Sequence, residues 1–138
     1  MALICDTGPL LAALDAADPD HGRCAVMLLR AEEDLVVPAL VLAELDYWCA
    51  QRLTAAAWLT FLGDVVEGAY RVEVPTDADL RRCRELQETY ADLRIGIVDA
   101  SVIALAERLA EPKVATLDHR HFRAVRPAHV AVLELRPD

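Results

Sequence analysis

Short apolar runs alternate with longer helical patterns along the whole chain, and this alternation constrains the fold more than any other feature. Strands are expected at residues 3–5, 35–37, 71–74, 113–117 and 130–135. Helices are expected after Pro9 and at residues 21–31, 38–50, 54–67, 76–90 and 98–109. The helix at 21–31 is expected to turn Val26, Met27 and Leu29 inward, and the helix at 98–109 to bury one apolar stripe. The other helix starts carry Pro38 in a first turn and Thr54 and Thr76 as caps. Because strands that are separated by helices form right-handed crossovers, the pattern predicts an α/β fold with a mostly parallel sheet and helices on both faces.

Length and composition bound the rest of the architecture. A chain of 138 residues is long enough to bury a substantial core, and we expect a single domain over residues 1–138. The apolar share of 55% excludes a disordered chain. No apolar run is long enough to span a bilayer, and the first residues lack a basic segment of the kind that begins a secretory signal. We therefore expect a cytoplasmic protein with no membrane association.

Cysteine spacing and net charge narrow the classes of function. The four cysteines are scattered among apolar neighbours, and no pair has the spacing of metal ligands. Buried, reduced thiols are the expected state. The net charge of −9 argues against binding nucleic acid through a general basic field, although it leaves room for a local, metal-assisted site.

Acidic residues occupy special positions in several of the predicted elements. Asp6 and Asp118 end predicted strands, and Asp99 lies in the first turn of a helix that follows Gly96. Parallel α/β sheets bind ligands at the carboxyl ends of their strands, so these acids are candidates for one site. Each also has a simpler explanation, because turns and helix starts commonly carry Asp.

Glu44 is the most informative of the acids. It lies on the apolar stripe of its predicted helix, with Leu40, Val41, Tyr47 and Trp48 one turn away. A carboxylate in that position is partly buried, and it needs an arginine partner, a proton or a metal ion. The simpler explanation is a salt bridge. Asp92, on the connection into the Asp99 helix, is the weakest candidate because loop acids are commonly only solvated.

Several carboxylates at one edge of a sheet repel one another unless a cation lies among them. Oxygen ligands without thiolates or a pair of imidazoles favour Mg²⁺ or Mn²⁺. Cations of this kind organise phosphate groups, activate water and stabilise the leaving oxygen of a phosphodiester.

These residues together resemble a known family. The resemblance rests on Asp6-Thr7-Gly8, the inward-facing Glu44, Gly96-x-x-Asp99-Ala100, and Thr116-Leu117-Asp118 followed by Phe122. This order is similar to that of the PIN domain, and more narrowly to its bacterial toxin ribonucleases of the VapC type. The resemblance spans nearly the whole chain. It implies a three-layer α/β/α sandwich, an endoribonuclease that depends on Mg²⁺ or Mn²⁺, a homodimer and a cognate antitoxin.

The resemblance also implies roles for individual residues. It assigns catalysis and metal binding to four carboxylates: Asp6, Glu44, Asp99 and Asp118. Asp92 corresponds to an accessory acid that many members carry, and the sequence leaves open whether Asp92 or Asp118 lies nearer the metal. Thr7 and Thr116 correspond to hydroxyl positions beside the acids, where they would orient carboxylates or water.

Several basic and aromatic residues are expected at the surface, where they could contact other molecules. His119 and His121 are expected to be surface residues beside the acids, and Arg94, Arg120 and Arg123 are candidates for contacts with RNA phosphates. Trp48 and Trp58 look exposed on their helices and are candidates for contact with an antitoxin.

Other functions fit the sequence less well. A haloacid-dehalogenase-like phosphatase needs an Asp two residues after Asp6, where this chain has Gly8. A response-regulator receiver needs a lysine late in the sheet, whereas Lys113 begins its strand. The remaining alternative is a catalytically inactive PIN-like protein-interaction module, which the intact set of acids disfavours.

Overall fold

The computed structural model describes all residues from 1 to 138. Its strands are β1 (Ala2–Cys5), β2 (Asp34–Pro38), β3 (Arg71–Glu73), β4 (Lys113–Ala115) and β5 (Glu134–Arg136). They form one sheet in the order β3-β2-β1-β4-β5, and every pairing is parallel. The prediction of an α/β fold around a parallel sheet is confirmed.

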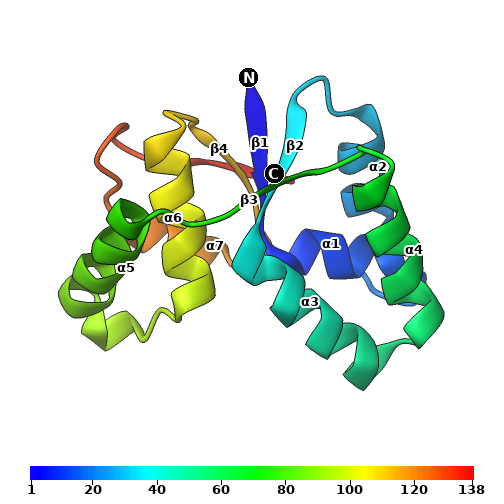
Figure 1. The fold of residues 1–138 in the computed structure, drawn as a ribbon. Coiled ribbons are helices and arrows are strands. Elements are labelled where there is room, and N and C mark those ends of the chain that lie inside the picture. Colours follow the sequence, from blue (N-terminus) through cyan, green and yellow to red (C-terminus); the bar gives the residue numbers. More distant parts are fainter.

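Helices cover both faces of this sheet. They are α1 (Thr7–Leu14), α2 (His21–Arg30), α3 (Ala39–Arg52), α4 (Ala55–Val66), α5 (Asp77–Thr89), α6 (Ile97–Arg108) and α7 (His119–Ala124), with a 3₁₀ turn, η1 (Ala91–Leu93). In Figure 1, α5 and α6 lie to one side of the strands and α1, α2 and α4 lie to the other. None of the helices is long and apolar enough to cross a membrane.

The helix with the most buried residues is α6, which packs against β1, β2 and β4. All seven residues from Ala100 to Ala106 are buried. The sequence predicted one apolar stripe, but α6 is enclosed more fully because α3 and α5 also pack against it. Small residues such as Ala100, Ser101 and Ala104 let the neighbouring backbones approach closely. This burial fixes the start of α6, and therefore Asp99, against the sheet.

The helix starts predicted from the capping residues Thr54 and Thr76 are confirmed. The Thr54 side chain accepts a hydrogen bond from the Ala57 backbone N–H at 3.3 Å at the start of α4. Thr76 and Asp79 form a reciprocal capping box at the start of α5, with bonds of 3.1 and 3.0 Å. Such caps satisfy backbone donors that the helix itself leaves free. Pro38 differs from expectation, because it ends β2 and precedes α3 instead of lying in its first turn.

The end of the chain differs from the sequence prediction. The fifth strand was expected at residues 130–135, but only Glu134–Arg136 pairs with β4. The alternation of Ala131, Leu133 and Leu135 with Val132 and Glu134 suggested the longer strand. Leu133 and Leu135 are buried and Val132 is exposed, as alternation requires, but the backbone before Glu134 is irregular. The short helix α7 was not predicted, because six residues are too few for a periodic pattern.

The inward face of α2 was predicted only in part. Val26, Met27 and Leu29 were expected to point into the core; Met27 is half-buried against it, but Leu29 is 87% exposed and Val26 is exposed as well. The buried residues are Cys24 and Leu28, which lie four positions apart on the same face. The helix carries more apolar residues than its packed face can bury, so residue type alone did not identify that face.

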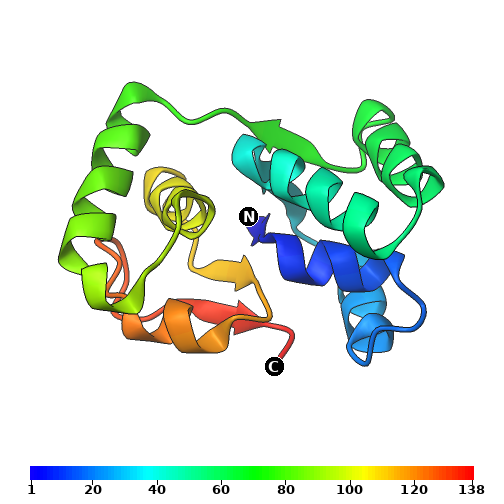
Figure 2. The same ribbon diagram turned by 90° about the horizontal axis from the view of Figure 1, so that it is seen from below.

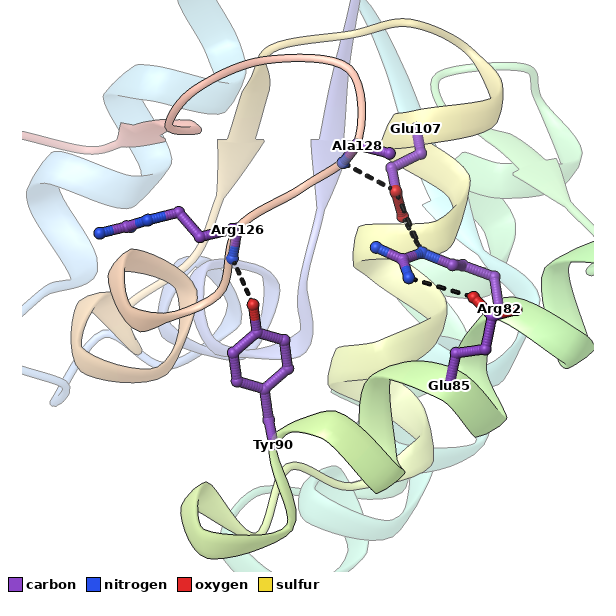
Figure 3. A network of polar contacts seen from close by, with 6 residues as sticks. All are labelled: Arg82, Glu85, Tyr90, Glu107, Arg126 and Ala128. Carbon is purple, nitrogen blue, oxygen red and sulfur yellow. Dashed lines mark hydrogen bonds and ion pairs between the residues drawn. The ribbon is translucent and has the colours of Figure 1, made fainter.

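A polar network fastens the segment that follows α7 to α5 and α6 (Figure 3). The Arg126 backbone N–H donates to the Tyr90 hydroxyl at 2.9 Å, and the Ala128 backbone N–H donates to Glu107 Oε2 at 2.9 Å. Glu107 also accepts from Arg82 Nε at 2.7 Å. These bonds hold the end of α7, and α7 carries part of the site described next.

Candidate active site

Adjacent parallel strands bring two of the predicted acids to the same edge of the sheet. Cys5 at the end of β1 pairs with Ala115 at the end of β4. The next residue, Asp6, donates its backbone N–H to the Ala115 carbonyl oxygen at 2.8 Å. Asp118 follows Ala115 by three residues, so both acids leave the sheet at its carboxyl edge. Figure 2 views this end of the molecule, where α1, α3, α6 and α7 surround the ends of the strands.

Thr116 links these two acids. Its hydroxyl is fully buried and donates to Asp6 Oδ2 at 2.8 Å. The Thr116 hydroxyl oxygen also accepts a hydrogen bond from the Asp118 backbone N–H at 3.1 Å. Thr116 therefore fixes the orientation of the Asp6 carboxylate and the path of the chain toward Asp118. Thr7, the other predicted hydroxyl, is buried, and its Oγ1 has no hydrogen-bond partner.

The carboxylates at this edge perturb one another. Burial raises the pKa of Asp6 to about 6; hydrogen bonds from the Thr116 hydroxyl and the Thr7 backbone lower it, while Glu44 and Asp118 raise it further. Burial, followed by the charges of Asp6, Asp118 and Glu44, raises the pKa of Asp99 to about 7. The charges of Glu44 and Asp118 therefore act on both Asp6 and Asp99.

Neutralising partners are nearly absent from this site. None of the four acids forms an ion pair with arginine or lysine. The salt bridge that was the simpler explanation for Glu44 is therefore not present. Glu44 is half-buried on α3, as its position on the apolar stripe predicted.

His121 belongs to the site, although the sequence suggested only a surface residue beside it. Its Nδ1 lies 2.7 Å from Asp118 Oδ2 and 3.9 Å from Asp99 Oδ2. Asp118 caps α7 by accepting from the His121 backbone N–H at 3.2 Å, and this cap brings the imidazole back over the acids. Ligand atoms of Asp99, Asp118 and His121 lie within 4.8 Å of one another. The sequence signal for His121 was its position three residues after Asp118, the N-cap of α7. That signal could not be used because α7 itself was not predicted.

A surface cleft opens over the cluster. Its lining residues come from the starts of α1 and α6, from α3 and from the turn after β4: Asp6, Thr7, Gly8, Leu11, Glu44, Trp48, Arg52, Asp99, Leu117 and Asp118. Gly8 approaches the turn closely, because a Cβ there would lie 3.3 Å from Leu117 Cβ. Asp92 is exposed on η1 and does not line the cleft, and neither do Arg94, Arg120 and Arg123.

The residues of the cleft fit a divalent cation. Carboxylate oxygens with raised pKa values gain stability when a positive charge lies among them. The unpartnered Thr7 hydroxyl adds another oxygen beside them, and the set suits Mg²⁺ or Mn²⁺. Asp6, Glu44, Asp99 and Asp118 would hold such an ion, with His121 at the rim.

Comparisons with known proteins agree with this geometry. The PIN domain family model matches residues 3–127. Ribonuclease VapC26 of Mycobacterium tuberculosis is 39% identical over 125 residues, which cover 91% of this chain and 93% of that protein. The crystal structure of VapC20 of M. tuberculosis, a toxin that cleaves the sarcin–ricin loop, superposes with a TM-score of 0.82 at 19% identity, covering 94% of this chain and 98% of that one.

The same fold recurs in solved complexes. VapBC2 of Rickettsia felis, bound to a DNA fragment from its promoter, gives a TM-score of 0.72 at 15% identity and covers 99% of this chain and 100% of that one. FitAcB of Neisseria gonorrhoeae gives 0.63 at 23% identity, with 97% of each chain covered. The resemblance inferred from the sequence is confirmed: the chain belongs to the PIN domain family, and within that family it groups with the VapC ribonucleases.

Proposed function

We propose that this chain is the ribonuclease toxin of a toxin–antitoxin pair and that it hydrolyses RNA phosphodiesters with the help of Mg²⁺ or Mn²⁺. The observation that carries the proposal is the set of four carboxylates, none paired with an arginine or lysine, in one cleft at the carboxyl edge of the sheet. The 39% identity to a protein named as a ribonuclease supports the reaction class.

Side chains of this chain prepare the site for that reaction. The Thr116 hydroxyl holds one oxygen of Asp6, and the cap of α7 holds Asp118 against His121. Burial of α6 holds Asp99 close to Asp6 and Asp118. A cation bound by these groups supplies positive charge that stabilises the oxygens of a phosphodiester and promotes ionisation of a water molecule.

The test is RNA cleavage under control of the metal. Purified protein is incubated with total RNA and Mn²⁺, with Mg²⁺, or with EDTA, and the cut ends are mapped by sequencing. We expect cleavage with either metal and none with EDTA, because the carboxylates alone repel both one another and the phosphate. Undiminished cleavage with all divalent metal chelated would contradict the metal dependence. Absence of cleavage under every condition would instead favour the alternative of an inactive PIN-like interaction module.

An antitoxin and a second copy of the chain are the proposed protein partners. Large apolar side chains lie exposed on the early helices, including Leu29, Leu59 and Val66. Trp48 and Trp58, which the sequence suggested for this role, are half-buried and pack against the core. Solved relatives include the VapBC2 complex. We expect expression of the chain alone to arrest growth and co-expression of an adjacent small gene to relieve the arrest; harmless expression of a verified active enzyme would count against a toxin.

The cytoplasm is the proposed compartment. All four cysteines are buried and free of disulfides, which fits a reducing environment. An RNA substrate is also found there.

A further inference from the structure

One face of α3 carries three different chemical groups into the cleft. Glu44, Trp48 and Arg52 are spaced four residues apart and therefore lie in a row along the helix. All three line the cleft. Arg52, the last residue of α3, is the one basic residue among the lining residues.

The guanidinium of Arg52 is held by an aromatic ring instead of by a carboxylate. Its Cζ lies 4.7 Å from the centroid of the Trp48 ring, within the range of a cation–π interaction. Trp48 itself is half-buried, packs against the core and meets Tyr47 edge-on at 5.1 Å between ring centroids. Arg52 forms no ion pair, although four acids line the same cleft.

We propose that Arg52, seated on Trp48, binds a phosphate of the RNA that flanks the phosphodiester to be cleaved. The proposal rests on the ribonuclease function proposed above. A guanidinium presents its N–H groups in a planar fork that matches phosphate oxygens, and stacking on an aromatic ring leaves that fork free. The guanidinium of Arg52 is exposed, held in place by Trp48 and not paired with a carboxylate, so its N–H groups can bind an anion.

Position along α3 assigns Arg52 to a flanking phosphate. The backbone of Arg52 lies about 12 Å from that of Glu44 along the helix axis, at about 1.5 Å per residue. The guanidinium lies over the ring of Trp48, whose backbone is about one helical turn from Glu44, so we expect it to meet a different phosphate from the one held near the carboxylates. In a chain with a net charge of −9, this local cation also offsets the repulsion between the cleft and an approaching polyanion.

The test compares Arg52→Ala with a matched control, Arg30→Ala. Arg30 is likewise exposed, ends helix α2, forms no ion pair and lies outside the cleft, so its loss changes the net charge equally. Binding of a fluorescein-labelled single-stranded RNA of mixed sequence is measured by anisotropy over a range of NaCl, in an Asp99→Asn background that prevents cleavage. We expect Arg52→Ala to weaken binding on the order of tenfold and to reduce the salt slope by about 0.7.

Further readouts separate the possible results. Arg52→Lys should restore the salt slope, because it keeps the charge, while recovering only part of the affinity. In an otherwise wild-type chain, Arg52→Ala should slow RNA cleavage while leaving the Mn²⁺-induced rise in Tm unchanged. If wild type binds and cleaves RNA but Arg52→Ala behaves like Arg30→Ala, the proposal is overturned and the ribonuclease function stands. If wild type neither binds nor cleaves RNA, both are overturned.

Discussion

Two aspartates in this chain are buried to the same degree but lie in opposite surroundings. Asp6 is 6% exposed and Asp79 is 5% exposed. Asp79 accepts from Arg108 Nε at 2.9 Å and from the Thr76 backbone N–H at 3.0 Å. Among side chains, Asp6 accepts a hydrogen bond only from the neutral hydroxyl of Thr116, at 2.8 Å, and it faces other carboxylates. One carboxylate is therefore neutralised by its own protein, and the other is left to be neutralised by something else.

The surroundings of each aspartate extend the contrast. Near Asp79 the charges alternate in sign, since Arg108 also lies 3.5 Å from Glu73, and Arg82 bridges Glu85 and Glu107. Part of this network is drawn in Figure 3. At the carboxyl edge of the sheet, four acids have no such partner. The ion pairs around Asp79 stabilise the fold. The four unpaired acids destabilise it, because they repel one another, but they remain free to bind a cation.

The largest expected effect comes from removing one charge at the unpaired cluster. Asp99→Asn deletes a negatively charged side chain that is a proposed metal ligand but keeps its shape and its position in the first turn of α6. We expect RNA cleavage with Mn²⁺ to fall to the background of the assay. The metal-free protein should be as stable as wild type or more so, because repulsion with Asp6, Asp118 and Glu44 is relieved. Thermal melts in EDTA and a cleavage assay measure the two effects separately.

Addition of Mn²⁺ provides the control. Binding of Mn²⁺ to the native state stabilises it, by about 2.7 kcal/mol at 100 times the Kd, and therefore raises Tm. We expect this rise in wild type and a much smaller one in Asp99→Asn. If the variant unfolds, Asp99 has a structural role at the helix start. If it folds, cleaves RNA normally and responds to Mn²⁺ like wild type, the metal site lies elsewhere.

The opposite result is expected at the paired aspartate. Asp79→Ala removes the partner of Arg108 and half of the capping box of α5. We expect the free energy of unfolding to fall by roughly 2–4 kcal/mol, as measured by urea denaturation. Cleavage per folded molecule and the Mn²⁺-induced rise in Tm should not change.

Arg84→Ala is the matched control for that substitution. Arg84 pairs with Glu88 on the exposed face of the same helix, and such pairs contribute roughly 0–1 kcal/mol. A loss of stability in Arg84→Ala as large as in Asp79→Ala would show that burial of the pair is not what matters. A loss of the Mn²⁺ response in Asp79→Ala would show that the two groups of acids are not independent.

Much of the structure around the two aspartates could be predicted from the sequence, because it depends on short, local patterns of residues. Thr76 predicts a helix start, and Glu44 on an apolar stripe predicts a half-buried acid. The convergence of Asp6 and Asp118 followed from the rule that parallel strands end at one edge. These inferences needed only the order of elements and the direction of each strand.

Other parts of the site depend on packing that no local pattern reveals. His121 reaches the acids because Asp118 caps a helix too short to be recognised. Arg52 lines the cleft because α3 extends to that residue and its side chain stacks on Trp48. Asp92, included by resemblance, lies exposed on η1, and its part in metal binding stays a prediction.

The smallest expected effect is a change of stability with pH. The folded-state pKa values of Asp6 and Asp99, about 6 and about 7, lie above their ordinary values. Between those ordinary values and pH 7 the folded chain therefore binds more protons than the unfolded chain, so its stability falls as pH rises. Glu33, whose pKa Lys113 lowers, acts in the opposite direction but only at more acidic pH.

We therefore expect metal-free wild type to melt a few degrees higher at pH 5 than at pH 7.5, with a smaller difference in Asp99→Asn. Mn²⁺ at pH 7.5 should offset the loss in wild type, because the cation takes the place of the protons among the carboxylates. Scanning calorimetry in EDTA between pH 5 and pH 8 measures the difference between the two proteins, in which the contributions of other titrating groups cancel. A wild-type Tm that stays level or rises over that range relative to the variant would mean that the four acids do not repel one another, and the cleft would then need no cation to balance them.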